Sequence, residues 1–326
     1  MISLVATVLN EGESLHRLMR SMVAQTRQPD EVVIVDGGSR DDTVAILESY
    51  AGQLPLRVVV EAGCNISEGR NRAIGAARGE IIAVTDAGVV LDARWLERLV
   101  QPLEDDANCA VVGGFFRPDY QNRFELAMSV TVLPLADEIQ AETFLPSSRS
   151  VAFRKAAWAA VGGYPEWLDY CEDLVFDLRL KAAVKTPFAF AGEAVVAFRP
   201  RGTLRSYFKQ YYLYARGDGK ADLWRKRHAA RYLTYVAAAP MIALLGAVVH
   251  PALWLLALVG GYVYLRQPYQ RLGKLAGNGL SGGDRLYVWG MIPVIRVVGD
   301  VAKMLGYPVG WRWRLRHDPP DWHTIG

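Results

Sequence analysis

The chain has 326 residues, of which 51% are hydrophobic and 3 are cysteines. This length allows two domains, and the hydrophobic content is high for a soluble enzyme but low for a polytopic transporter. Cys64, Cys109 and Cys171 are far apart and odd in number, so they predict neither a disulfide framework nor a zinc site and favour a reducing compartment.

Charge is distributed unevenly along the chain. Residues 1–198 contain 18 Lys and Arg against 28 Asp and Glu, a net charge of −10, whereas residues 199–326 contain 19 against 6, a net charge of +13. A basic half of this kind is typical of contact with anionic lipid or nucleic acid. The most apolar stretches lie in the same half, which favours membrane lipids, and no polar, aromatic-interleaved groove for nucleic acid is evident.

The first hundred residues alternate between buried-strand and helix patterns. Strands are predicted over residues 2–8, 31–35, 56–60 and 81–85, and helices follow them over about residues 15–22, 43–50, 67–77 and 95–103. Ser67 is expected to cap the third helix. No basic segment precedes the first strand, so no signal peptide is predicted. The alternation predicts parallel βαβ units in a doubly wound, mostly parallel α/β sheet.

The central part is more mixed. Short strands are predicted at 110–112 and 151–153, and helices at 124–135, 174–183 and 206–214. We therefore divide the chain into a catalytic domain, residues 1–220, and a membrane-associated helical region, residues 221–326. The nucleotide-binding half of the catalytic domain would be residues 1–115, and the acceptor half residues 116–220.

A charge-free stretch covers residues 232–265, interrupted by His250-Pro251. It predicts a helical hairpin that either spans a bilayer twice or enters and returns, unless it is a buried hairpin of a soluble domain. Basic residues flank it at 225–231 and 266–274, which places both flanks in the cytosol by the positive-inside rule.

A second apolar segment covers residues 286–305. It carries Arg296, Asp300 and Lys303 at spacings of four and three, which predicts an amphipathic helix at the membrane interface rather than another span. Tryptophans and arginines at 289 and 311–316 suit a layer of anionic lipid headgroups.

Polar residues follow three of the predicted strands: Thr7 to Glu11, Asp36 to Ser39, and Asp86. Ligands bind beyond the carboxyl ends of strands in such sheets. With Arg70-Asn71-Arg72 in the intervening helix, these residues could hold a ribose or base, a phosphate and a metal ion. Each aspartate could instead be a turn former, and the arginines a solvated helix face.

Glu172 and Asp173 come at the start of a predicted helix, after Gly162-Gly163-Tyr164-Pro165. Adjacent carboxylates there commonly stabilise the helix N-terminus. Alternatively, one of them is a general base that faces an acceptor hydroxyl.

In this order, these motifs resemble family 2 of the inverting glycosyltransferases, which have the GT-A fold. The resemblance covers about residues 2–220 and rests on five segments, namely 5–11, 33–43, 69–80, 85–88 and 161–173. It implies a sugar transfer from a nucleotide sugar, linked to UDP, GDP or dTDP, onto a hydroxyl group.

The resemblance also implies roles for individual residues. Asp173 would be the catalytic base, and Glu172 would position the base or the acceptor. The remaining residues would hold the nucleotide sugar: Thr7, Asn10, Glu11, Asp36, Arg70, Asn71, Asp86, Gln210 and Arg216. For Gln210 and Arg216, a basic linker that touches the membrane is an equal alternative.

One position departs from the family pattern. The family's metal motif usually ends in an aspartate, and Gly88 occupies that place here. Asp86 would then be the metal ligand, with diphosphate oxygens and water completing the shell of Mn²⁺ or Mg²⁺.

The apolar hairpin suggests a lipid-linked acceptor or a cell-surface glycan of the cell envelope. Catalysis would take place on the cytoplasmic face of the inner membrane. Alternatives are a polyprenyl-phosphate glycosyltransferase, whose phosphate acceptor needs no general base, and a membrane-anchored nucleotide-binding protein without catalysis.

Overall fold

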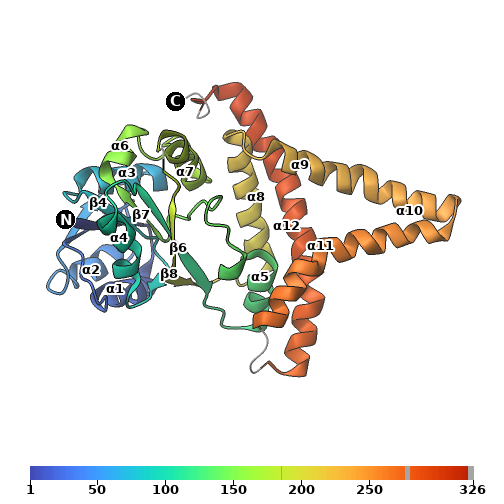
Figure 1. The fold of residues 1–326 in the computed structure, drawn as a ribbon, viewed down its shortest axis with the longest axis horizontal. Coiled ribbons are helices and arrows are strands. Elements are labelled where there is room, and N and C mark those ends of the chain that lie inside the picture. Colours follow the sequence, from blue (N-terminus) through green and yellow to red (C-terminus); the bar gives the residue numbers. More distant parts are fainter. Residues whose placement is uncertain (185, 276–279, 322–326) are drawn as a thin grey trace. The chain divides into compact units, whose positions relative to one another are not determined.

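The computed structural model describes residues 1–184, 186–275 and 280–321, and its contacts divide the chain into two units (Figure 1). Unit 1 contains Met1–Asp119, Ala136–Arg199 and the chain end from Pro320, and unit 2 contains Tyr120–Leu135 and Pro200–Pro319. This division differs from the boundary expected at residue 220. Helices α5 (Arg123–Val132) and α8 (Leu204–Lys220) belong to unit 2, because both pack on α12 (Gly282–His317).

Unit 1 is built on one eight-stranded sheet with the strand order β3-β2-β1-β4-β7-β6-β8-β5. Pairs β1–β2, β1–β4, β2–β3 and β6–β8 are parallel, while β7 runs antiparallel to β4 and β6, and β5 to β8. The strands are β1 (Ile2–Val8), β2 (Glu31–Asp36), β3 (Leu56–Val60), β4 (Ile81–Val84), β5 (Val89–Leu91), β6 (Val111–Pro118), β7 (Val151–Arg154) and β8 (Ala189–Phe198).

The sheet confirms the expected α/β class, and its first four strands lie where the periodicity predicts them. Strands β5 and β8 were not expected. β8 has Gly192 inside it and only two β-branched residues, Val195 and Val196, so its sequence is a weak strand signal. β5 follows a turn in which Gly88 adopts φ +75°.

The helices of unit 1 are α1 (Leu15–Val23), α2 (Thr43–Glu48), α3 (Ile66–Ala76), α4 (Trp95–Asp105), α6 (Lys155–Ala160) and α7 (Glu172–Ala183). The cap of α3 is Asn65, and the expectation of Ser67 was wrong. Asn65 Oδ1 accepts from the backbone N–H groups of Ser67 (2.9 Å) and Glu68 (3.0 Å), and Glu68 Oε2 accepts from Asn65 N (2.7 Å). This capping box fixes the first turn of the helix that carries Arg70.

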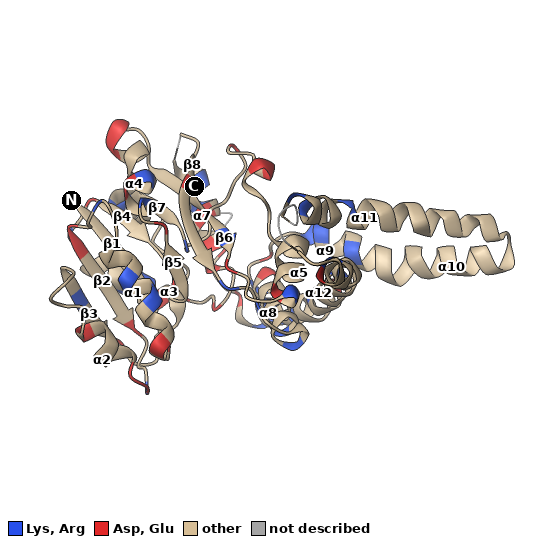
Figure 2. Cartoon of the chain, turned by 90° about the horizontal axis from the view of Figure 1, so that it is seen from below, with Lys and Arg blue, Asp and Glu red and all other residues tan. Residues whose placement is uncertain are grey.

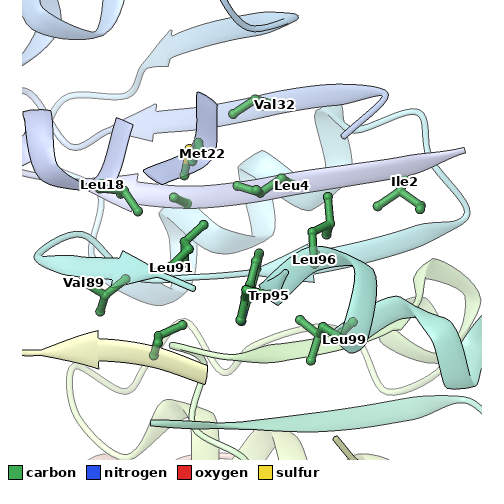
Figure 3. Close-up of a cluster of buried hydrophobic side chains, with 14 of the residues drawn as sticks. Ile2, Leu4, Leu18, Met22, Val32, Val89, Leu91, Trp95, Leu96 and Leu99 are labelled. Atoms are coloured by element: carbon green, nitrogen blue, oxygen red, sulfur yellow. The ribbon is translucent and has the colours of Figure 1, made fainter. Parts of the chain in front are cut away.

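Both faces of the sheet are covered by helices, which is why its central strands read as continuous apolar runs. Successive residues of β1 point to opposite faces. Leu4 belongs to the core beside α1 and α4, and Val5 to the core on the other face. Trp95 lies fully buried inside the first core (Figure 3). Its Nε1 donates to Ser150 Oγ at 2.8 Å.

Unit 2 is helical, and its longest element is α12. This helix extends beyond the expected range of 286–305 at both ends and includes Pro293 and Pro308. Its buried residues recur every three or four positions and pack inside unit 2. At Gly306 and Gly310 an added Cβ would lie 2.1 and 1.9 Å from backbone oxygens of α8. Glycine therefore lets α8 and α12 approach closely, and a location of α12 at a membrane interface remains a prediction.

The rest of unit 2 contains an apolar helical hairpin. Its first arm runs without interruption through α9 (Arg225–Tyr232), the π-helical turn η3 (Leu233–Ala238) and α10 (Ala239–Val248). After the short η4 (Pro251–Leu253), α11 (Trp254–Leu275) returns beside it. Within the described ranges, one helix, Arg225–Val248, is long and apolar enough to cross a membrane, and only 6% of its apolar window is buried. The charged residues gather at the base of the hairpin and are absent from its tip (Figure 2).

Candidate active site

The carboxyl ends of β2, β1 and β4 lie side by side, since these neighbouring strands are parallel. The sheet therefore brings together three of the polar segments singled out in the sequence. Asp36 ends β2, Thr7 lies near the end of β1 opposite Val35, and Asp86 follows β4. An added Cβ at Gly69 would lie 2.9 Å from Thr7 Cγ2, so glycine allows α3 to pack against this edge.

Asp36 is fully buried and holds the turn that follows β2. Its Oδ2 accepts hydrogen bonds from the backbone N–H groups of Gly38 (2.9 Å) and Ser39 (2.8 Å), and its Oδ1 accepts one from Ser39 Oγ. Gly38 has φ +92°, and an added Cβ would lie 2.9 Å from Ala62 Cα. The carboxylate therefore fixes a tight turn directly after the carboxyl end of β2.

Asn10 and Glu11 form the loop beside this turn. Asn10 adopts φ +53°, its N–H donates to Ser39 Oγ at 2.8 Å, and its Oδ1 accepts from Arg40 N at 2.9 Å. Glu11 N donates to Thr43 Oγ1 at 2.9 Å. Burial raises the pKa of the Glu11 carboxyl, and the nearby Asp41 and Asp86 carboxylates act in the same direction. Asn10 and Asp36 thus share Ser39 as a hydrogen-bond partner, and Thr7 and Glu11 belong to the neighbouring strand end and loop.

The second cluster centres on Arg70, which is buried with 2% of its surface exposed. Its Nη1 donates to Glu172 Oε1 and its Nη2 to Asp86 Oδ1, both at 2.6 Å. Burial alone would lower the pKa of Arg70, but the Asp86 and Glu172 carboxylates raise it, so it stays charged. One guanidinium thereby ties the end of β4 to the beginning of α7, and its bond to Glu172 joins residues that are 102 apart in the sequence.

Asp173 stands next to this bridge at the start of α7, and its Oδ1 accepts from the Leu174 N–H at 2.9 Å. Burial raises the pKa of Asp173, Arg70 opposes this shift, and the Asp86 carboxylate adds to it. Burial and the Asp173 charge raise the pKa of Glu172 as well. An acidic pair with raised pKa values is suited to accept a proton.

Two residues of this cluster were not predicted from the sequence to be site residues. Arg149 Nε lies 3.7 Å from Asp86 Oδ2, so Asp86 faces two guanidinium groups. Tyr164 is buried, its ring lies 5.3 Å from the Arg70 guanidinium carbon, and its hydroxyl is 3.0 Å from Ser148 Oγ. Their sequence signal is weak, because Arg149 precedes β7 in an irregular loop and Tyr164 sits in a glycine-rich turn.

The structure gives Asn71 a positioning contact. Its Nδ2 donates to Tyr164 O (2.8 Å) and Glu166 Oε1 (3.0 Å), and its Oδ1 accepts from Trp158 Nε1 (3.1 Å) and Tyr164 N (2.9 Å). These four bonds use the full hydrogen-bonding capacity of the amide. Asn71 therefore anchors the segment before α7, and its expected contact with a nucleotide stays a prediction.

Gln210 and Arg216 lie on α8, in unit 2. Gln210 Nε2 donates to Tyr214 Oη at 2.8 Å. The backbone of Arg216 lies at the close approach with Gly306 and Gly310 of α12. Their expected contact with a diphosphate stays a prediction.

A divalent cation would find one expected protein ligand here, Asp86. Among the residues that the structure describes, no three His, Cys, Asp or Glu side chains gather into a metal site. The open space at Gly88, where an added Cβ would meet nothing within 4 Å, lies where the family pattern has its last aspartate. A cation at Asp86 would therefore depend on oxygens of a bound diphosphate for most of its ligands.

Comparisons with known proteins agree with the resemblance to glycosyltransferase family 2. Residues 3–156 match the model of "Glycosyl transferase family 2". The O-antigen chain rhamnosyltransferase WbaN of Salmonella anatum is 26% identical over 201 residues, 58% of this chain and 62% of WbaN. The undecaprenyl-phosphate 4-deoxy-4-formamido-L-arabinose transferase of Sodalis glossinidius is 35% identical over 112 residues, 32% of this chain and 34% of that protein. The chain thus spans less than two thirds of either relative.

Among solved structures, the mannosyltransferase PcManGT of Pyrobaculum calidifontis, in complex with GDP-Man and Mn²⁺, superposes with a TM-score of 0.58. It is 19% identical, and the match covers 97% of this chain and 87% of PcManGT. At this identity the likeness concerns the fold, and it confirms the expected GT-A-like architecture.

Proposed function

We propose that the chain is an inverting glycosyltransferase that moves a sugar from a nucleotide sugar to a hydroxyl group. The match of residues 3–156 to the model of glycosyltransferase family 2 supports this proposal. The observation that carries the proposal is the buried bridge from Asp86 through Arg70 to Glu172, with Asp173 beside it. It joins the expected donor side of the sheet to the expected acceptor side by a single charged group.

The donor nucleotide would bind along the edge formed by Thr7, Asn10, Glu11 and Asp36. The base and ribose would lie against this edge, held in shape by the turn at Asp36. The diphosphate would point toward Asp86. Cations near that point, Arg70 and Arg149, would favour the negative charge that grows on the leaving group.

Transfer would be a single displacement. The acceptor oxygen would form a bond to the anomeric carbon while the bond from that carbon to the diphosphate breaks. The hydroxyl proton would pass to Asp173, whose pKa is raised by burial. Glu172, held by Arg70, would keep the start of α7 in place, and Asn71 would fix the segment before it.

A bound Mn²⁺ or Mg²⁺ at Asp86 would supply further positive charge to the leaving diphosphate. PcManGT, described above with GDP-Man and Mn²⁺, supports a divalent cation for a protein of this fold. The arginines around Asp86 would share this task.

The acceptor would be a lipid-linked or cell-surface glycan at the cytoplasmic face of the membrane. Support comes from the exposed apolar helix Arg225–Val248 and from the names of WbaN and the Sodalis transferase, which refer to the O-antigen chain and to undecaprenyl phosphate. The basic flanks of the hairpin would contact anionic lipids.

The test is a donor screen with detergent-purified protein. UDP-, GDP- and dTDP-sugars would be offered with Mn²⁺ or Mg²⁺ and total polyprenyl-linked lipids, and nucleoside diphosphate release would be measured. We expect release from one donor class with the native chain and loss of release in Asp173→Asn, with donor affinity within about twofold by calorimetry. Loss of donor binding in Asp173→Asn would contradict its role as base. Nucleotide binding without release from any donor would indicate a binding protein without catalysis.

A polyprenyl-phosphate glycosyltransferase is the second candidate, favoured by the 35% identity to the Sodalis transferase. A phosphate acceptor needs no general base. Transfer to undecaprenyl phosphate that survives in Asp173→Asn would support this candidate over hydroxyl transfer.

A further inference from the structure

A groove of about 480 Å³ lies between the beginning of α9 and the C-terminal half of α12, within unit 2. Tyr232, Tyr307 and Trp311 contribute aromatic surface to it, and Ala229 and Pro308 contribute small apolar surface. The buried ring of His228, stacked on Tyr307 and hydrogen-bonded to Asp218, completes the wall. Aromatic side chains with one polar atom are typical of the boundary between water and a bilayer. The groove therefore has walls suited to an apolar chain.

One part of the same groove is cationic. The Arg225 guanidinium carbon lies 4.6 Å from the centre of the Trp311 ring, and Arg225 Nη2 donates to Asp222 Oδ2 at 2.5 Å. Asp222 is mostly covered, but 63% of the Arg225 side chain is exposed. Arg225 is thus held at the groove by one carboxylate and one ring, and it keeps N–H donors that face solvent.

The surroundings of the groove carry a large excess of positive charge. Residues 220–231 and 300–316 contain nine Lys and Arg against two Asp, a net charge of +7. The nine are Lys220, Arg225, Lys226, Arg227, Arg231, Lys303, Arg312, Arg314 and Arg316. Such a field attracts an anionic group from solution or from a membrane surface.

The apolar walls continue onto exposed apolar surface. Leu233 and Val236 follow the groove on the first arm of the hairpin and are 65% and 66% exposed, and Leu305 and Val309 on α12 are 55% and 44% exposed. A ligand with an anionic head at Arg225 would therefore find exposed apolar side chains for its tail on both helices.

We propose that this groove binds the phosphate group and the first isoprenoid units of a polyprenyl-phosphate-linked acceptor lipid. The inference rests on the proposed glycosyl transfer to a lipid-linked acceptor and names the part of the chain that holds the lipid. A phosphate on a branched apolar chain matches both the exposed Arg225 donors and the aromatic walls, whereas a nucleotide would need polar partners for its base.

The experiment measures lipid binding without any donor. Farnesyl phosphate, a short isoprenoid phosphate, would be titrated into the full-length chain in detergent and followed by calorimetry. Ala229 is exposed and lines the groove, so Ala229→Trp should fill it, while Ala230→Trp adds the same side chain at an exposed neighbour outside the lining. We expect affinity to fall about tenfold or more in Ala229→Trp and by less than about twofold in Ala230→Trp.

A second pair tests the charge. Arg225→Glu should weaken farnesyl phosphate binding about tenfold, and Lys226→Glu, an exposed neighbour outside the lining, by less than about twofold. Farnesol, which lacks the phosphate, and inorganic phosphate, which lacks the chain, should both bind at least about tenfold more weakly. Unchanged melting temperatures in all four variants would exclude misfolding.

Equal affinities in Ala229→Trp and Ala230→Trp would overturn the proposal. Equal affinity for farnesyl phosphate and dioctanoyl phosphatidylglycerol would also overturn it, since the groove would then bind any anionic lipid. Nucleoside diphosphate binding in the same preparation, compared with an Asp36→Ala variant, reports on the proposed transfer separately. A failed donor site therefore cannot be mistaken for a failed lipid groove.

Discussion

Replacement of Arg70 by methionine tests the central bridge most directly. Methionine keeps the length of the apolar stem but removes both 2.6 Å ion pairs, and it leaves Asp86 and the almost fully buried Glu172 without their cation. Removing one partner of a buried pair costs about 3–5 kcal/mol. For a unit of this size, each kcal/mol corresponds to about 2–4 °C in melting temperature, so we expect a decrease of about 6–20 °C.

The matched control is Arg72→Met on the same helix. The Arg72 side chain is 66% exposed and lies 3.9 Å from Glu61, so its loss should change stability by less than about 1 kcal/mol. Thermal unfolding of the two variants in the same detergent would be followed by near-ultraviolet circular dichroism. Adding Glu172→Gln to Arg70→Met should restore part of the loss, because it removes one of the uncompensated charges. Equal melting temperatures for Arg70→Met and Arg72→Met would refute the reasoning.

The same variant predicts a change with pH. Burial raises the pKa of Glu172 and Asp173 in the folded chain, and Arg70 opposes both shifts. Without Arg70 both pKa values rise further. A carboxyl with a raised folded pKa stabilises the fold below its unfolded pKa, and this stabilisation is lost as pH rises through the folded pKa. The loss in free energy of unfolding caused by Arg70→Met should therefore be smallest near pH 4 and grow toward neutral pH. Any residual sugar transfer should need a higher pH, because Asp173 must lose its proton before it can act as a base.

Three further predictions concern single positions. Asp36→Ala removes the acceptor of the Gly38 and Ser39 N–H groups, so nucleotide affinity should fall about tenfold or more and stability by about 1–3 kcal/mol. Calorimetry and denaturant unfolding measure these effects, and unchanged affinity would remove Asp36 from the donor site. Gly306→Leu should push α12 away from α8, because even an added Cβ would lie 2.1 Å from a backbone oxygen of α8. Limited proteolysis should then cut unit 2 faster than in the native chain. Gly290→Leu, where an added Cβ on α12 meets nothing within 4 Å, should stay as resistant as the native chain. Gly88→Asp enters open space at φ +75°, so it should tighten Mn²⁺ binding in the presence of a nucleoside diphosphate, and equal Mn²⁺ affinity would argue against a cation at Asp86.

Local patterns in the sequence were sufficient for the first half of the sheet. β1 to β4 are parallel, covered on both faces and separated by helices, so each strand is a short apolar run that stands out from its neighbours. Parallel strands also bring their carboxyl ends to one edge, which is why Thr7, Asp36 and Asp86 could be placed at a common site before any coordinates.

The second half depended on long-range pairing. β8 runs beside β6 and β5 and contains glycine and alanine in place of a β-branched run. β8 is therefore a strand because it pairs with β6 and β5, and its own residue pattern does not predict a strand. The expected domain boundary at residue 220 differs from the observed division for a similar reason. α8 belongs to unit 2 because it packs on glycines of α12 that lie almost a hundred residues later in the chain.

The sequence by itself determined the residue types of the site and their order, because helix caps, strand ends and charge blocks are local signals. Only the tertiary structure decided which of those residues meet. Arg70 could be read as a solvated helix residue, and its burial between Asp86 and Glu172 follows from the packing of α3 and α7 on the same face of the sheet. Asn71 could be read only as a nucleotide ligand, and the structure adds four bonds by which it holds residues 158–166. Side-chain partners across a hundred residues depend on the whole packed chain, and no short segment carries that information.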